Sequence, residues 1–200
     1  MTLRTANADD LEAIMALERA SFPTDAWSEA MMREELASRH GRYLVLEEAG
    51  RLIGYGGIRA VQGGTDADIQ TIALVEGARG RGRGRGLLRS LLTEAGERGA
   101  REVFLEVRAD KPIPQALYVS EGFVEIARRP NYYQPDGVDA IVMRLDLRGW
   151  LAEHSGMDVV DSASEIRSES ASCAPDAPTP AESPTLDRVP TAVSEAGACT

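Results

Sequence analysis

The sequence predicts an α/β fold (α+β, mixed), in which a mixed β-sheet carries helices on its faces. Apolar residues alternate in some segments and recur every three or four positions in others, which gives the order β-α-α-β-β-β-α-β-α-β-β. Two strand patterns, over 43–46 and 52–58, flank the turn-forming residues 48–51 and indicate a hairpin. A strand pattern over 68–74 leads through four Arg-Gly pairs, Arg79 to Gly86, into a leucine-rich helix.

The other elements are placed by the same periodicities and by residues that begin or end helices. Asp9, with Glu12 three residues later, forms a capping pair that predicts a helix through Phe22. Ser28 is the expected N-cap of a second helix, and Gly99 is expected to end the leucine-rich one. Further elements are expected as a helix over 110–121 and as strands over 2–5, 102–108, 124–127 and 138–145.

Length and charge bound the number of domains and the class of partner. The chain of 200 residues has room for one domain of ordinary size, expected over 1–150. Its net charge of -10 argues against a nucleic-acid binder, and most of that charge lies after Leu151, among nine acidic residues and two arginines. The same segment has five prolines, eight serines and no aromatic residue. Residues 151–200 are therefore expected to be a disordered acidic, Pro/Ser-rich tail.

Cysteine and histidine usage excludes several kinds of site from the expected domain. Both cysteines, Cys173 and Cys199, lie in the tail, so the domain has no thiolate for a disulfide, a metal site or a nucleophile. His40 and His154 are far apart in the sequence, and no metal site is expected. No apolar run approaches the roughly 20 residues of a membrane span, and the N-terminus has no apolar signal segment. We expect a cytoplasmic protein with no membrane partner.

The Arg-Gly run indicates an anionic ligand. Glycines let backbone N–H groups turn toward a ligand, and the helix that follows adds the positive end of its dipole beside four arginines. A phosphate or pyrophosphate is therefore the expected guest. An RNA-binding low-complexity segment is an alternative, although the run has an apolar element on either side and no interleaved aromatic residue. The P-loop pattern is absent, and strict alternation of glycine fits the dinucleotide-binding fingerprint poorly.

The residues Arg79-Gly80-Arg81-Gly82-Arg83-Gly84 match the pattern Arg/Gln-x-x-Gly-x-Gly/Ala of the GNAT family of N-acetyltransferases. Four more segments fall in register with that family: 71–74, 105–108, 116–118 with 122–123, and 131–133. Together they resemble the RimI-type ribosomal-protein-alanine N-acetyltransferases over about residues 1–148. The resemblance implies a GNAT fold with a mixed, mostly antiparallel sheet, and acetyl-CoA as cosubstrate without a metal.

The resemblance also implies roles for individual residues. Glu106 matches the family's general base and Tyr118 its general acid. Residues matching acceptor-lining segments are Phe22, Trp27, Tyr132 and Tyr133. Where the family usually has asparagine, this chain has Lys111, which could reach a phosphate as a point charge. The residues implied to bind acetyl-CoA are Ile72, Ala73 and Leu74 at the acetyl and pantetheine portion, Arg79, Gly80, Arg81, Gly82, Arg83, Gly84 and Arg85 at the pyrophosphate, and Lys111.

These roles agree with the chemistry of acetyl transfer to an amine. An α-amine has a pKa of about 7.7–8.0 and a lysine about 10.4, so near neutral pH only the former is neutral to a useful extent. One carboxylate, such as Glu106, then suffices as base, although an ion pair with Arg108 is a purely structural alternative for it. Tyr118 can protonate the leaving thiolate, or it can simply pack one face of its helix.

The sequence thus predicts an acetyl-CoA-dependent enzyme that acetylates a protein N-terminal α-amine by direct transfer in a ternary complex. The N-terminal alanine of a ribosomal protein is the acceptor that the resemblance implies. Two alternatives stay open: a GNAT enzyme acting on a lysine side chain or a small amine, and a nucleic-acid-binding module that uses the Arg-Gly run.

Overall fold

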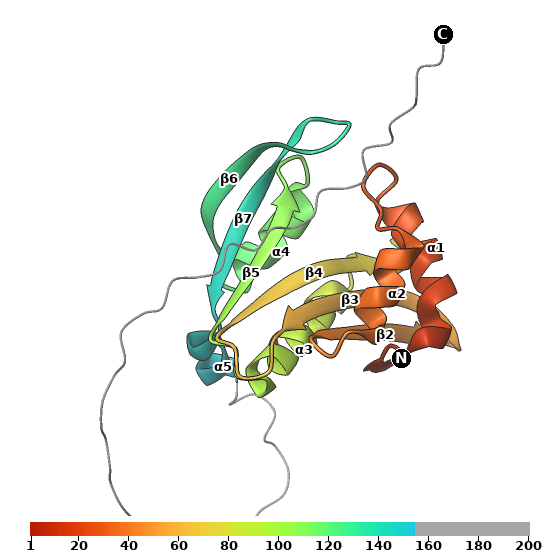
Figure 1. The fold of residues 1–200 in the computed structure, drawn as a ribbon, viewed down its shortest axis with the longest axis horizontal. Helices are drawn as coiled ribbons and strands as arrows, with labels where there is room; N and C mark the ends of the chain where they lie inside the picture. Colours follow the sequence, from red (N-terminus) through yellow and green to blue (C-terminus); the bar gives the residue numbers. More distant parts are fainter. Residues whose placement is uncertain (155–200) are drawn as a thin grey trace, which may run out of the picture. The chain divides into compact units, whose positions relative to one another are not determined.

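The computed structural model describes residues 1–154, and its elements are labelled in Figure 1. Two helices follow the first strand, three strands come next, and helices and strands are interspersed over the rest of the chain, with two short 3-10 turns, η1 and η2. The strands are β1 (Thr2–Thr5), β2 (Gly41–Glu48), β3 (Arg51–Ala60), β4 (Asp66–Leu74), β5 (Glu102–Arg108), β6 (Val124–Tyr133) and β7 (Val138–Asp146). The helices are η1 (Ala8–Asp10), α1 (Leu11–Ser21), α2 (Glu29–Ala37), η2 (Glu76–Ala78), α3 (Arg83–Glu97), α4 (Pro112–Ser120) and α5 (Leu147–His154).

The seven strands form one sheet in the order β1-β2-β3-β4-β5-β7-β6. Every neighbouring pair is antiparallel except β4 and β5, which are parallel. The predicted mixed, mostly antiparallel sheet is therefore confirmed. Among residues 1–154, no helix is long and apolar enough to cross a membrane.

The parallel contact between β4 and β5 is very short. It joins only Asp66–Asp68 to Glu102–Phe104. Beyond these residues the two strands diverge, and Figure 1 shows β4 and β5 leaving their common origin in different directions. The rest of β4 pairs only with β3, and the rest of β5 only with β7, so both strands keep one unpaired backbone edge where they separate.

A β-bulge changes which face of β4 each residue presents. Gly57 pairs with Thr71 and Ile58 with Ile69, so Gln70 is the extra residue. Ile69, before the bulge, belongs to the core on the α3 side, whereas Ala73, after it, belongs to the core under α1 and α2. The bulge therefore lets one strand contribute to both cores.

The sheet has a hydrophobic core on each face. On one face α3 packs on β2, β3 and β4 and against α5, in a core that also includes residues of β5 and β7. On the other face α1 packs on β3 and β4, and α2 packs on β2 (Figure 1). The predicted leucine-rich helix is confirmed as α3, and the residues of its buried face are all at most 1% exposed, namely Leu87, Leu88, Leu91, Leu92 and Ala95. Complete burial of a leucine side chain contributes roughly 1.5–3 kcal/mol, so this helix is a major source of stability.

The first helix begins differently from the prediction. Asn7, and not Asp9, is the capping residue, because its side chain accepts a hydrogen bond from the Asp9 N–H (2.7 Å). In return, Asp10 Oδ2 accepts a hydrogen bond from the Asn7 N–H (2.8 Å), which completes a capping box. The sequence carries this three-residue spacing twice, at Asn7–Asp10 and at Asp9–Glu12, and the chain uses the first. Arg4 pairs with Asp10 (2.7 Å) and lowers the pKa of that carboxyl.

Three other boundaries also differ from the prediction. Helix α3 already begins at Arg83, so the second half of the Arg-Gly run is helical. Strand β6 continues to Tyr133, which places both tyrosines at the end of a strand and not in a connection. Helix α5 has no counterpart among the predicted elements and continues to His154, beyond the expected domain end at Trp150. The disordered tail was expected over 151–200, but residues 151–154 belong to α5, and the rest of it, residues 155–200, lies outside the described residues.

Leu91→Ala should lower the free energy of unfolding by about 2–5 kcal/mol, because it opens a cavity at a side chain that is 0% exposed. Urea denaturation followed by circular dichroism measures this. Ile113→Ala is the matched control, since Ile113 is 83% exposed and its truncation should change stability by no more than about 0.5 kcal/mol. Equal losses in the two variants would contradict the assignment of α3 to the core.

Candidate active site

The loop between β4 and α3 depends on two glycines. Gly80 and Gly82 both have φ of +73°, in the left-handed region that other residues seldom adopt. Gly82 is the N-cap of α3, and the first helical hydrogen bond runs from the Gly86 N–H to the Gly82 carbonyl (3.0 Å). The N–H groups of the first turn therefore have no carbonyl partner within the helix. They lie at the positive end of the α3 dipole, which is suited to bind an anion.

Gly84 is different from these two glycines. Its φ does not lie in the left-handed region, and a Cβ built on it would meet only Leu74 Cδ1 at 3.4 Å and Leu117 Cδ2 at 3.8 Å. Both distances are ordinary van der Waals contacts, so the fold accepts alanine here. A need for glycine at position 84 would therefore have to come from a ligand.

The four arginines of the run are not equivalent. Arg79 Nε donates to the Leu74 carbonyl (3.0 Å), and so ties the loop to the end of β4. Arg83 Nη2 lies 2.6 Å from Glu48 Oε1, and its side chain is only 13% exposed. Arg85 donates to Ser120 Oγ (3.0 Å) on α4. Arg81 is exposed and has no ion pair with the part of the chain that the structure describes. The side chains of Arg83 and Arg85 thus anchor α3 to its neighbours.

A buried carboxylate organises this anchoring. The Glu121 side chain is 0% exposed and follows α4, where it lies 3.3 Å from Arg85 Nε. Arg89 binds both of its oxygens, with Nε–Oε2 at 2.9 Å and Nη2–Oε1 at 3.1 Å. The indole N–H of Trp150 donates to it at 3.4 Å. Glu121 therefore joins the start of α3 to α4 and α5.

Glu106 lies on β5 past the point where β4 diverges. Glu106 and Arg108 share one face of the strand, opposite a buried face formed by Val103, Leu105 and Val107. The Glu106 side chain is 7% exposed, and its Oε1 lies 2.9 Å from Arg129 Nη1. Arg108, the partner considered from the sequence, is instead bound to other carboxylates. The Arg129 contact was not predicted, because it joins β5 and β6 across β7, and the sequence does not show that β7 lies between them in the sheet.

Tyr118 faces the core from α4. Its ring packs edge-on against Phe123, with centroids 5.8 Å apart and an interplanar angle of 63°. Burial raises the pKa of Tyr118 to about 12, so the hydroxyl keeps its proton throughout the neutral and mildly alkaline range. Packing and proton donation, the two roles considered for this residue, are therefore compatible.

The connection between α1 and α2 carries the two predicted acceptor aromatics. Phe22 and Trp27 are both half-buried and pack against the core under α1 and α2, so each also serves that core. The Trp27 N–H donates to Glu18 Oε1 (3.0 Å), and the Tyr55 hydroxyl donates to Glu18 Oε2. Burial raises the pKa of Glu18, whose side chain is almost completely enclosed. Glu18 was not predicted from the sequence, although its hydrogen bonds fix the α1–α2 connection to the core.

Arg108 joins three segments around the same region. Its guanidinium binds Asp110 (Nε–Oδ1, 3.0 Å) and Asp136 (Nη2–Oδ2, 2.9 Å), and lies 3.8 Å from Asp25. It also stacks over the Tyr133 ring at 5.1 Å from the centroid. The α1–α2 connection, the end of β5 and the β6–β7 turn are thereby held to one side chain that is 11% exposed.

The remaining predicted residues lie in or beside this region. The Tyr132 and Tyr133 rings are perpendicular, at 5.2 Å between centroids, and Arg129 lies over the Tyr132 ring at 5.6 Å. Lys111 is exposed at the N-cap position of α4, next to Asp110. Ile72, Ala73 and Leu74 are the last three residues of β4, on the part of the strand that diverges from β5. The structure thus brings Glu106, Arg108 and the two tyrosines together, while the Arg-Gly loop lies at the end of β4.

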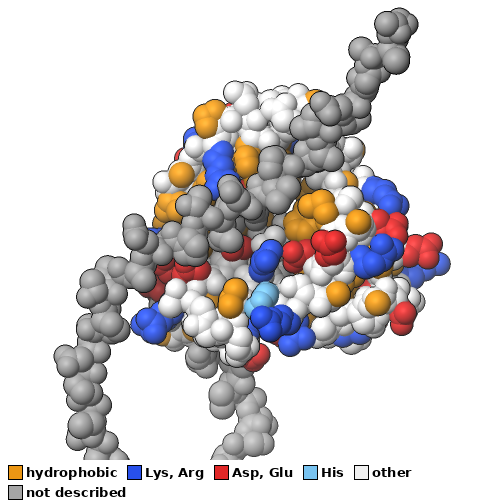
Figure 2. Space-filling model, viewed as in Figure 1, with side chains coloured by type: hydrophobic (Ala, Val, Ile, Leu, Met, Phe, Trp, Pro, Cys, Tyr) orange, Lys and Arg blue, Asp and Glu red, His pale blue; other side chains and the backbone are white. Residues whose placement is uncertain are grey.

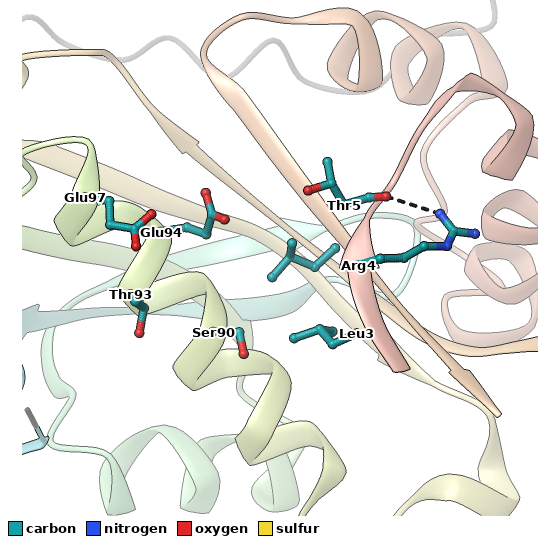
Figure 3. Close-up of a pocket in the computed structure, with 8 residues that line it drawn as sticks. Leu3, Arg4, Thr5, Ser90, Thr93, Glu94 and Glu97 are labelled. Atoms are coloured by element: carbon teal, nitrogen blue, oxygen red, sulfur yellow. Dashed lines mark hydrogen bonds between the residues drawn. The ribbon is translucent and has the colours of Figure 1, made fainter. Parts of the chain in front are cut away.

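Charged side chains elsewhere on the surface are mixed in sign. Over α1 and α2, Figure 2 shows basic side chains next to acidic ones, and Glu29 lies 2.6 Å from Arg33 and 3.7 Å from Arg19. A depression lies between β1 and α3, lined by Leu3, Arg4, Thr5, Leu44, Ser90, Thr93, Glu94 and Glu97 (Figure 3). It contains none of the predicted site residues, and Glu94 within it is paired with Arg42 (2.9 Å).

Comparison with known proteins decides the family. The model of the Acetyltransferase (GNAT) family matches residues 11–123. This chain belongs to the GNAT family. The predicted family and fold are confirmed, and the protein is an acetyltransferase.

Several relatives of this GNAT protein carry names that specify an activity. N-alpha-acetyltransferase RimI of Mycobacterium tuberculosis is 39% identical over 150 residues, which cover 73% of this chain and 92% of that protein. The ribosomal protein bS18-alanine N-acetyltransferase of Escherichia coli K12 is 35% identical over 153 residues, or 73% and 97% of the two chains. The crystal structure of the ribosomal-protein-S18-alanine N-acetyltransferase from Escherichia coli superposes with a TM-score of 0.65 at 30% identity, covering 73% and 93%.

Gly84→Ala should weaken CoA binding about tenfold, because the added methyl group would stand beside the open N–H groups of the first turn of α3. Isothermal titration calorimetry with CoA measures this. Gly86→Ala is the matched control: position 86 is on the same turn, has no atom within 4 Å of a built Cβ, and should keep its affinity. Both variants should be as stable as the parent or slightly more so, by up to about 1 kcal/mol. Equal CoA affinities of the two variants would show that no ligand approaches Gly84.

Proposed function

We propose that this protein transfers the acetyl group of acetyl-CoA to the N-terminal α-amine of a protein, with the N-terminal alanine of a ribosomal protein as the favoured acceptor. One arrangement carries the proposal. Strands β4 and β5 diverge, the glycine loop closes the end of the first, and the enclosed carboxylate of Glu106 lies on the second. The names of the relatives from Mycobacterium tuberculosis and Escherichia coli support the choice of acceptor. We place the reaction in the cytoplasm, where new ribosomal proteins present their N-termini.

The residues of the loop fit a cofactor that carries a pyrophosphate. The first-turn N–H groups of α3 and the exposed Arg81 present positive charge to a ligand. Gly80 and Gly82, in the left-handed conformation, leave room for that ligand because they have no side chain. Bound acetyl-CoA would supply the acetyl group as a thioester with a thiolate leaving group. The unpaired edge of β4 at Ile72–Leu74 would lie along its pantetheine and acetyl portion, and Lys111 would add a cation near its phosphates.

Glu106 would act as the general base. The acceptor arrives chiefly as an ammonium ion, and about a tenth of an α-amine is neutral near pH 7, against less than a thousandth of a lysine. Glu106 would accept the ammonium proton directly or through one water, which leaves the nitrogen lone pair free to form the new C–N bond. This preference for an amine that is easily deprotonated favours an N-terminus over a lysine side chain.

Tyr118 would act as the general acid. When the C–S bond breaks, the departing sulfur needs a proton, and a phenol with a pKa of about 12 holds one at any physiological pH. The nitrogen loses its second proton as it becomes the amide, and this proton would restore the Tyr118 hydroxyl, directly or through water. Because both cysteines lie at positions 173 and 199, beyond the GNAT domain, no cysteine of that domain can carry the acyl group. Direct transfer between two bound substrates is the mechanism that these residues support.

Glu106→Gln and Tyr118→Phe should each lower kcat by about a hundredfold or more, while the KM for acetyl-CoA stays within about twofold. Each change removes one proton-transfer group without altering side-chain size appreciably. Steady-state kinetics with a peptide acceptor and detection of free CoA measure this. Glu102→Gln is the control, since Glu102 is on the same face of β5 but pairs with Arg144 (3.1 Å). Full activity of either test variant would remove that residue from the mechanism.

An acceptor screen tests the choice of substrate. A library of peptides with free N-termini, matched peptides with a blocked N-terminus and an internal lysine, and a set of small polyamines are each incubated with acetyl-CoA and read by mass spectrometry. We expect acetylation of free N-termini, with alanine first. Turnover confined to lysine peptides or polyamines would replace the proposal with the corresponding GNAT activity. A parallel titration with single-stranded RNA at physiological salt addresses the alternative of nucleic-acid binding.

A further inference from the structure

We propose that Arg129 is a displaceable counter-ion of Glu106, which the ammonium group of the incoming acceptor replaces. The inference rests on the proposed function, because it gives Glu106 an amine as partner. It concerns a positioning residue on β6, outside the segments that resemble the cofactor and acceptor sites.

The sheet places Arg129 within reach of Glu106 across an intervening strand. In the order β5-β7-β6, Glu106 is opposite Val142 and Arg129 is opposite Ala140, so all four residues share one face of the sheet. Two strand spacings amount to about 10 Å, a distance that a long arginine side chain can largely bridge. Ala140 carries only a methyl group, which leaves the path over β7 open. The resulting Nη1–Oε1 distance is 2.9 Å.

The two members of the pair differ in what they need. The Glu106 side chain is 7% exposed, and an enclosed carboxylate without a positive partner is strongly destabilising. The Arg129 side chain is 48% exposed on an edge strand, so its guanidinium can leave the ion pair and be hydrated at a small cost in free energy. The Arg129 guanidinium carbon lies 5.6 Å from the centroid of the Tyr132 ring, and a cation–π contact with this ring can hold the guanidinium when it leaves Glu106.

Of the two arginines near Glu106 in the part of the chain that the structure describes, Arg129 is the one that can move. Arg108 shares the face of β5 with Glu106, but its guanidinium is held by Asp110 and Asp136 and is 11% exposed. Moving it would release three segments of the chain at once. Arg129 has no such second ion pair among the contacts of residues 1–154.

Exchange of one cation for another keeps Glu106 compensated throughout the reaction. The acceptor's ammonium replaces the guanidinium, and transfer of its proton to Glu106 makes both groups neutral. The acetylated product is an amide without charge, so it cannot compete for Glu106 once that carboxyl has returned its proton to water. The return of Arg129 then favours release of the product.

The test compares Arg129→Gln with Arg128→Gln, assayed with the peptide acceptor at about pH 7.5, where the α-amine is still largely cationic. Arg128 is the matched control, because it is adjacent on β6, is 54% exposed and pairs only with Glu125 (2.7 Å) among the residues described. In Arg129→Gln the KM for the acceptor should fall about threefold or more, since no resident cation must be displaced. Its kcat and its KM for acetyl-CoA should stay within about twofold, and Arg128→Gln should change none of the three constants.

A purely structural role for Arg129 would not lower the acceptor KM. An unchanged or higher KM in Arg129→Gln, or a kcat reduced more than twofold, would overturn the inference, because Arg129 would then be absent from the exchange or a fixed support for the base. A fall in KM that Arg128→Gln shares equally would also overturn it, since the effect would be one of overall charge. Absence of turnover by the unsubstituted protein on any N-terminal peptide would overturn the proposed function itself, and the inference with it.

Discussion

The separation of β4 from β5 is the constraint on which the rest of this domain depends. Only Asp66–Asp68 and Glu102–Phe104 hold the two strands together, so the sheet is continuous at one end of the pair and open at the other. A single helix, α3, must therefore cover the junction, and its five buried side chains contact residues from both sides of it. The open end exposes two backbone edges and the face that carries Glu106. Fold and site are consequences of the same interrupted pairing.

Two enclosed carboxylates of the domain, Glu121 and Glu18, accept hydrogen bonds from elements distant in the sequence. Glu121 is bound by Arg89 and Trp150, and Glu18 by the Trp27 N–H and the Tyr55 hydroxyl. Removing a donor from such a group leaves a desolvated polar atom, which costs more than the hydrogen bond itself contributes. These carboxylates therefore fix the loops around the site more firmly than exposed ion pairs would.

Much of this architecture could be predicted from the sequence, because local patterns determine it. The leucines of α3 recur with helical spacing, and the alternation in β5 places Glu106 opposite the buried valines. Contacts between distant strands have no such signal. The Arg129–Glu106 pair depends on the β5-β7-β6 order, and the Glu18 contacts depend on how α1 packs over β3. Helix α5 was missed because glycine at 149 weakens a pattern that is otherwise helical.

The last helix also has a bearing on where this domain can end. Trp150 is 6% exposed and its indole reaches the carboxylate that holds Arg85 and Arg89 at the start of α3. His154 stacks on the same indole, with ring centroids 4.2 Å apart. A chain shortened before Trp150 would leave Glu121 with one fewer donor and open the core beside it, directly behind the glycine loop. The shortest autonomous form of this enzyme should therefore retain His154.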